Sequence, residues 1–237
     1  MPPPEAERKA LGEGLQRLNE NMVTLSQLAQ LAIRKAVESL EQGNGAGAQD
    51  VFTLDDEIYA LKERILQNCI DLIALHAPVA RDLRTITASL EITTDLDRVG
   101  RYAKDIAELT RQMPRESRGE LRKIGKLSRM GELTIRMIDI ALDAFINRDA
   151  EPVRNIIQED DAVDALHDEL FREIVNRMAD RSLAPQLGAQ FILINRYFER
   201  LADHAVNVGD HVAYMMTGQR LMHVKRAKSG LPLGVQR

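Results

Sequence analysis

Polar side chains near the end of the chain are spaced so that they could bind a cation together. Asn195, Glu199, Asp203 and Asn207 follow one another at four-residue intervals. Residues four apart lie on one face of an α-helix, so a helix here would carry all four in a single stripe. Like charges at this spacing destabilise an isolated helix by about 0.2–0.5 kcal/mol per pair. A facing arginine or a bound cation is expected to offset that repulsion.

A second acidic stripe precedes the first in the sequence. Asp160 and Asp164 repeat the four-residue spacing. Other candidate ligands lie close to them in the sequence: Asp161, His167 and Asp168. Two such stripes on neighbouring helices would supply several hard oxygen ligands, which suit Mg²⁺, Ca²⁺, Mn²⁺ or iron. The alternative is an ordinary solvated face whose charge is neutralised by Arg196 and Arg200.

Helices must position these side chains, because apolar residues recur at three- and four-residue steps through most of the chain. The breaks between helical stretches fall at glycine, proline and turn residues: 43–47, 77–78, 113–114, 147–149 and 180–185. No stretch shows the period-two alternation of a strand. The sequence therefore predicts an all-α fold of two tandem antiparallel three-helix bundles.

The two halves of the chain also resemble each other. Three pairs of segments match: residues 31–34 with 133–136, 55–56 with 160–161, and 97–99 with 199–201. The partners are separated by 102, 105 and 102 positions, a register that chance matches would not hold over three helices. This duplication predicts three-helix units at 8–114 and 117–218. A basic segment at 219–237, broken by glycine and proline, is expected to be a disordered tail.

The first unit retains only part of the acidic stripes. Asp97 stands at the position of Glu199, but Arg101 stands at the position of Asp203. Asp55 remains, as does Asp105. We expect Arg101 to form an internal ion pair with Asp97 or Asp105, because a guanidinium there would compete with a cation. Any metal site should therefore be stronger in the second unit.

Five further residues have weaker claims to a role. His204 and His211 lie seven positions apart on the last helix and would be auxiliary ligands, although such histidines are more often satisfied by hydrogen bonds. Glu91 and Asp95 are expected on a charged surface. Cys69 lies on an apolar helix face and is expected to be a small core residue.

Composition excludes several functional classes. The chain has 237 residues, a single Cys and a net charge of −4. One cysteine excludes a disulfide framework and a cysteine-rich metal site, so any metal must be held by oxygen, with histidine. Only 4% of residues are aromatic and none is Trp, which argues against nucleic-acid binding. No apolar run approaches the roughly 20 residues of a membrane span and no signal peptide is evident, so a cytoplasmic location is expected.

With these motifs in view, the chain resembles the PhoU family of phosphate-signalling proteins. The family's E(D)xxxD motif, on the third helix of each repeat, is matched by Glu199-Arg200-Leu201-Ala202-Asp203. The first copy, Asp97-Arg98-Val99-Gly100-Arg101, lacks the final acid. The family's helix-opening segment is similar to residues 78–84. The resemblance covers about residues 8–217.

The resemblance implies a negative regulator of phosphate uptake and of the phosphate-starvation response, without enzymatic activity. Its expected partners are the ATPase of the phosphate ABC transporter, a sensor histidine kinase and a second copy of the chain, with at most peripheral membrane contact. Several family members bind iron or zinc clusters on the E(D)xxxD faces. That property carries over to Glu199 and Asp203 directly, and to Asp97 as half a motif.

Two other functions compete with this interpretation. A ferritin-like carboxylate diiron oxidase requires a Glu-x-x-His motif on each of two helices. The nearest match is a single segment with the shorter acid, Asp164-Ala165-Leu166-His167. A metal-free helical adaptor would use the acidic stripes as a docking surface. There is no glycine-rich phosphate-binding loop, so nucleotide binding is not expected.

Overall fold

Six long helices account for most of the computed structural model, which describes residues 5–42, 47–114, 120 and 124–220. Their bounds are α1 (Glu5–Gln42), α2 (Ala48–His76), α3 (Ala80–Gln112), α5 (Gly125–Asn147), α6 (Val153–Ala179) and α7 (Pro185–Thr217). No strand occurs within the described ranges, which confirms the all-α fold. Residues 115–119, at the junction of the two predicted units, and residues 221–237 of the predicted tail lie outside the described residues.

The helices end at the residues that break the helical pattern. α2 ends at His76, two positions before Pro78, because the residue preceding a proline is disfavoured in a helix. Pro185 opens α7, where its missing N–H needs no partner. Gly218 closes α7 with a left-handed φ of +76°, and its N–H donates to the last turn of the helix at 2.8 Å. Local residue chemistry therefore sets these boundaries.

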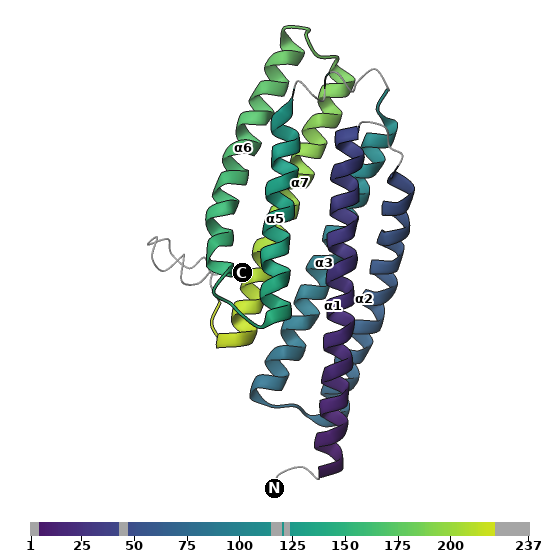
Figure 1. Ribbon diagram of the computed structural model, residues 1–237, viewed down its shortest axis with the longest axis vertical. Helices are drawn as coiled ribbons and strands as arrows, with labels where there is room; N and C mark the ends of the chain where they lie inside the picture. Colours follow the sequence, from purple (N-terminus) through teal and green to yellow (C-terminus); the bar gives the residue numbers. More distant parts are fainter. Residues whose placement is uncertain (1–4, 43–46, 115–119, 121–123, 221–237) are drawn as a thin grey trace, which may run out of the picture.

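Within each half, three antiparallel helices pack on one another: α1, α2 and α3 in the first, and α5, α6 and α7 in the second (Figure 1). The halves also join along their lengths, because α3 packs on α7 and α1 packs on α5. Across the α1–α5 contact, Gln30 Nε2 donates to Asp139 Oδ1 at 3.0 Å, and Arg34 pairs with the same carboxylate. Two corresponding pairs of helices, α1 with α5 and α3 with α7, thus lie against each other. The contact between α3 and α7 is called the seam below.

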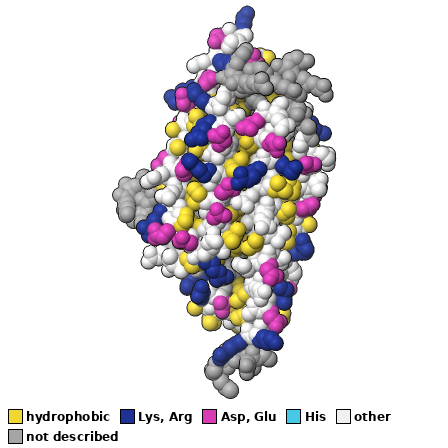
Figure 2. Space-filling model, viewed as in Figure 1, with side chains coloured by type: hydrophobic (Ala, Val, Ile, Leu, Met, Phe, Trp, Pro, Cys, Tyr) yellow, Lys and Arg dark blue, Asp and Glu magenta, His cyan; other side chains and the backbone are white. Residues whose placement is uncertain are grey.

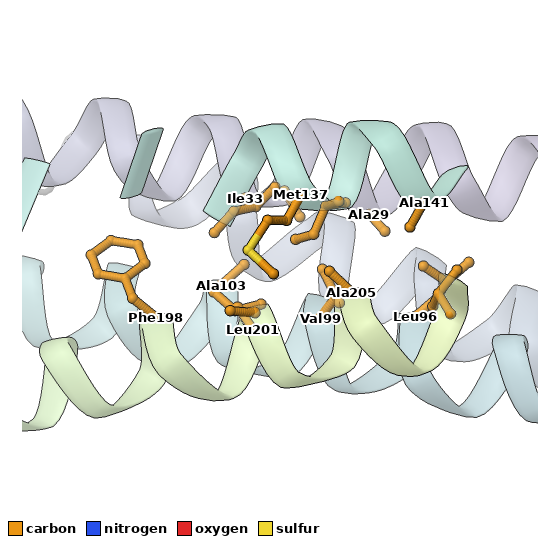
Figure 3. Packing of buried hydrophobic residues seen from close by; sticks show 14 of the residues in the cluster. Ala29, Ile33, Leu96, Val99, Ala103, Met137, Ala141, Phe198, Leu201 and Ala205 are labelled. Carbon is orange, nitrogen blue, oxygen red and sulfur yellow. The ribbon is translucent and has the colours of Figure 1, made fainter. Parts of the chain in front are cut away.

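One apolar core is shared by the helices that meet between the halves. Buried side chains converge there from α1, α3, α5 and α7 (Figure 3): Ala29, Ile33, Leu96, Val99, Ala103, Met137, Ala141, Phe198, Leu201 and Ala205. Removing this apolar surface from water stabilises the association of the halves. Cys69 of α2 is also fully buried, as expected for a small core residue.

The surface carries charge of both signs. On the face shown in Figure 2, acidic and basic side chains are interspersed, so this face produces no large field of one sign. Among the described helices, none is long and apolar enough to cross a membrane.

Candidate functional site

The two acidic stripes of the second half meet between α6 and α7. Asn195 of α7 is fully buried, and its Nδ2 donates to the backbone oxygen of His167 of α6 at 3.0 Å. This bond fixes the register of the two helices. Glu199 lies close enough to His167 and Asp203, and Asp203 to Asp164, for their charges to interact. Asp164, His167, Glu199 and Asp203 are called the acidic cluster below.

Two carboxylates of the acidic cluster, Glu199 and Asp164, lie in an environment that disfavours negative charge. Burial raises the pKa of Glu199 and of Asp164 above their ordinary values, and the negative charge of Asp203 raises both further. His167 opposes the shift at both residues, and two neighbouring arginines oppose it at Glu199. A cation bound here would relieve this repulsion.

Arginines neutralise part of that charge from the outside of α7. Arg196 Nη1 lies 2.7 Å from Glu199 Oε1, and Arg200 Nη1 lies 3.5 Å from Asp203 Oδ2. Two buried atoms of the acidic cluster, Glu199 Oε2 on α7 and His167 Nδ1 on α6, form no hydrogen bond, although Arg200 Nε lies 3.9 Å from Glu199 Oε2. A buried polar atom without a partner costs about 1–3 kcal/mol. A ligand that bonded either atom would remove this cost.

The donor atoms suit a metal ion, although the side chains are not arranged as a finished site. Carboxylates with an imidazole are ligands that iron, zinc and manganese accept. Within the described residues, no group of three or more His, Cys, Asp or Glu side chains is arranged to hold a metal ion. Metal binding would require Glu199 to leave Arg196 and turn toward α6. The hydrogen bond from Asn195 to His167 already joins α6 and α7 beside these side chains.

Two other predicted ligands lie at the margin of the acidic cluster. Asp160 lies one turn before Asp164 on α6 and is partly buried. Asn207 turns toward α3, where its Nδ2 lies 3.4 Å from Asp95 Oδ1. The fold therefore brings Glu199, Asp203 and Asp164 together and places Asn207 at the seam.

In the first half, lysines neutralise the corresponding acids. Lys62 Nζ lies 3.3 Å from Asp97 Oδ2, and Lys104 Nζ donates to Asp55 Oδ2 at 2.7 Å. Both carboxylates are buried. The expected ion pair of Arg101 with Asp97 is present at 3.8 Å. Sequence reasoning identified the arginine and both acids as relevant but missed the two lysines.

A second polar cluster, which the sequence did not predict, crosses the seam. Asp95 of α3 accepts a hydrogen bond from His204 Nδ1 at 2.7 Å and lies 3.3 Å from His211 Nε2. Glu91 lies 2.7 Å from both His211 Nδ1 and Arg220 Nη2. These five residues are called the seam cluster. The expectation that Asp95 lies on a charged surface is wrong, because α7 covers that side of α3 and leaves the residue only 8% exposed.

The seam cluster holds Asp95 in its charged form. Burial alone would raise the pKa of Asp95, but hydrogen bonds from His204 and His211 outweigh burial and keep the pKa below its ordinary value. Tyr102 of α3 packs beside Tyr197 and His204 of α7, with ring centroids 5.7 Å apart in each pair. Polar and aromatic contacts together therefore stabilise the contact between the halves.

Replacing Arg220 with alanine should lower the free energy of unfolding by about 1 kcal/mol. The guanidinium lies 2.7 Å from Glu91 and 3.2 Å from Asp210, and 5.1 Å from the ring centre of Tyr214. Its partial exposure limits the effect, which should shrink further at high salt. Urea unfolding would measure the change. Arg154→Ala, which removes a fully surface-exposed ion pair, is the matched control, and an equal loss in both variants would contradict a special role for Arg220.

Comparison with known proteins relates this arrangement to a family. A model of the PhoU domain matches residues 22–110 and 127–212, one match in each half. The phosphate-specific transport system accessory protein PhoU homolog of Clostridium acetobutylicum is 32% identical over 216 residues, which span 90% of this chain and 97% of that protein. PhoU homolog 2 of Mycobacterium tuberculosis is 31% identical over 211 residues, spanning 89% of this chain and 98% of that protein.

Solved structures agree with the sequence matches. PhoU from Pseudomonas aeruginosa superimposes with a TM-score of 0.80 at 28% identity, covering 88% of this chain and 99% of that one. The phosphate transport system regulatory protein PhoU from Streptococcus pneumoniae gives a TM-score of 0.77 at 27% identity, covering 89% of this chain and 99% of that one. Because the domain model matches both halves and these relatives match nearly their whole length, the chain belongs to the PhoU family.

Proposed function

We propose that this protein is an accessory regulator of phosphate transport, which limits phosphate uptake and the phosphate-starvation response when phosphate is plentiful. One observation carries the proposal: both halves match the PhoU domain. The relatives that match over nearly their full length are phosphate-specific transport system accessory proteins. The protein acts by binding other proteins and performs no catalytic step.

Its partners in this proposal are the ATPase of the phosphate ABC transporter and a sensor histidine kinase. A chain that binds both would couple transport to signalling from the cytoplasm, as a homodimer and with at most peripheral membrane contact. Exposed apolar side chains near the α2–α3 turn support a role in protein contact: Ile70, Leu75 and Val79 are 55%, 75% and 74% exposed.

The proposal includes a divalent cation, iron or zinc, in the acidic cluster. Glu199 and Asp203 from α7 would hold it together with Asp164 and His167 from α6. Two observations support this assignment: Glu199 Oε2 and His167 Nδ1 are buried without a hydrogen bond, and the pKa values of Glu199 and Asp164 are raised. The ion would neutralise the carboxylates and link α6 to α7, so its binding free energy would favour the helix arrangement that the partners contact.

A deletion strain should express its phosphate-starvation genes even in high phosphate. Plasmid-borne wild type should restore repression of a starvation reporter, whereas Glu199→Gln/Asp203→Asn should restore it only weakly. Glu132→Gln/Asp143→Asn removes the same charge from the exposed face of α5 and should restore it fully. A deletion strain that still represses the reporter in high phosphate would contradict the regulatory role.

The same variants separate the metal-dependent regulator from its alternatives. Glu199→Gln/Asp203→Asn should weaken zinc binding by the purified protein by at least about 100-fold, because direct ligands are lost. Equal and negligible zinc binding in wild type and variant, with repression intact, would favour the metal-free adaptor. Turnover of ferrous iron with oxygen or peroxide would favour the diiron oxidase.

A further inference from the structure

The two repeats can be compared position by position where α2 faces α3 and where α6 faces α7. The first repeat has these residues: Asp55, Tyr59, Lys62, Asp97, Arg101, Lys104 and Asp105. The second repeat has, in the same order: Asp160, Asp164, His167, Glu199, Asp203, Val206 and Asn207. Three carboxylates face three fixed cations in the first set. The second set holds four carboxylates and one histidine, with no lysine or arginine.

Contacts show that the matched positions are equivalent in space as well as in sequence. Lys62 Nζ lies 3.3 Å from Asp97 Oδ2, and His167 at the matched position is close enough to lower the pKa of Glu199. Arg101 pairs with Asp97, where Asp203 instead repels Glu199. The same pair of positions is therefore attractive in the first repeat and repulsive in the second.

The two lysines of the first repeat pair with buried carboxylates. The side chain of Lys62 is 19% exposed and that of Asp97 is 10% exposed, so solvent screens their attraction only partly. The hydrogen bond from Lys104 to Asp55 raises the pKa of Lys104 against the opposing effect of burial. Asp55 is 3% exposed and forms an ion pair with this ammonium group.

We propose that Lys62 and Lys104, together with Arg101, are built-in counter-cations that take, in the first repeat, the place of the metal ion in the second. This inference rests on the proposed metal in the acidic cluster. The first repeat then binds no metal, and it keeps its shape when metal is removed. Only the α5–α7 half responds to metal supply, which makes the two repeats of one chain a constant half and a responsive half.

The test uses a chain whose second-repeat site is already disabled by Glu199→Gln/Asp203→Asn. In this background the natural first repeat should bind no zinc in equilibrium dialysis, and added zinc or chelator should leave its melting temperature unchanged. Adding Tyr59→Asp/Lys62→His/Arg101→Asp gives the first repeat the ligand types of the second. That chain should bind about one zinc ion and should melt at a higher temperature with zinc than with chelator.

A charge-removing variant tests the same inference without metal. Lys62→Met should lower the melting temperature of the otherwise natural chain by about 4–10 °C, because Asp97 loses its main counter-charge while remaining buried. Lys62→Arg should retain most of the stability. Lys35→Met is the matched control, since Lys35 pairs with the exposed Asp50 at 2.8 Å, and its effect should be at most about 2 °C.

Three results would overturn the inference. The first is that the natural first repeat binds zinc in the Glu199→Gln/Asp203→Asn chain and that Asp97→Asn abolishes this binding. The second is a converted repeat that melts cooperatively but binds no zinc, and the third is a Lys62→Met variant as stable as the Lys35→Met control. The proposed metal fails separately, if wild type and Glu199→Gln/Asp203→Asn bind equally little zinc. The Lys62→Met measurement remains decisive in that case for the role of the lysine.

Discussion

Replacing Phe198 with alanine should lower the free energy of unfolding by about 3–5 kcal/mol, because the variant removes a large buried ring and leaves a cavity. Phe198 of α7 is fully buried and points into the core shared by the two halves (Figure 3). A Cβ at Gly131 of α5 would lie only 3.1 Å from the ring tip and 3.1 Å from Val37 of α1. The ring thus fills space where helices of both halves meet, and a neighbouring side chain cannot easily take its place.

Urea unfolding of three variants would check this expectation. Phe198→Leu should cost much less than Phe198→Ala, because most of the buried volume remains. Phe171→Ala removes a phenylalanine that is 44% exposed on α6 and should change stability by no more than about 0.5 kcal/mol. A loss below about 1 kcal/mol for Phe198→Ala would show that the two halves do not depend on this shared core.

Helix identity and helix ends were predictable because both depend on local chemistry. The three- and four-residue periodicity places one apolar face on each helix, and burial of residues such as Ile58 and Val163 follows from it. Pro78, Pro185 and Gly218 end or begin helices through restrictions on their own backbone or that of the preceding residue. None of these effects requires a distant contact.

The seam was not predictable from the same patterns. The constant offset between the halves shows which helices correspond but not which of them pack together. Glu91 and Asp95 are spaced like surface acids, and their partners His204 and His211 lie more than 100 positions away on another helix. The burial of Asp95 depends on the docking of α7, a tertiary contact that leaves no mark in the periodicity of α3.

The acidic cluster was predictable in outline because Asp164, Glu199 and Asp203 all project from helix faces that adjacent helices must share. The neutralisation of the corresponding acids in the first half was only partly predictable. Arg101 stands within the motif itself, whereas Lys62 is on another helix. Taken by itself in the sequence, Lys62 looks like an ordinary lysine on a helix surface. Its role becomes visible only when both helices of each repeat are aligned and the distance to Asp97 is known.

Replacing Asp95 with asparagine should lower the free energy of unfolding at neutral pH by about 1.5–3 kcal/mol, because the variant removes the charge from a buried carboxylate that accepts hydrogen bonds. The folded-state pKa of Asp95 is held below its ordinary value by His204 and His211, in spite of burial. A carboxylate with a lowered pKa contributes stability above its unfolded pKa and loses it as pH falls through its folded pKa. The difference between wild type and variant should therefore narrow as the pH falls below about 4.

Urea unfolding of wild type and Asp95→Asn at several pH values between about 7 and 3 would measure this difference. Asp50→Asn is the matched control, because Asp50 pairs with Lys35 at 2.8 Å but has a side chain that is 61% exposed, so its loss should cost at most about 1 kcal/mol. A difference for Asp95 that does not narrow between about pH 4 and pH 3 would contradict the argument. In that case the charge of Asp95 would not stabilise the seam, and the stability of the contact between the halves would come from its apolar core alone.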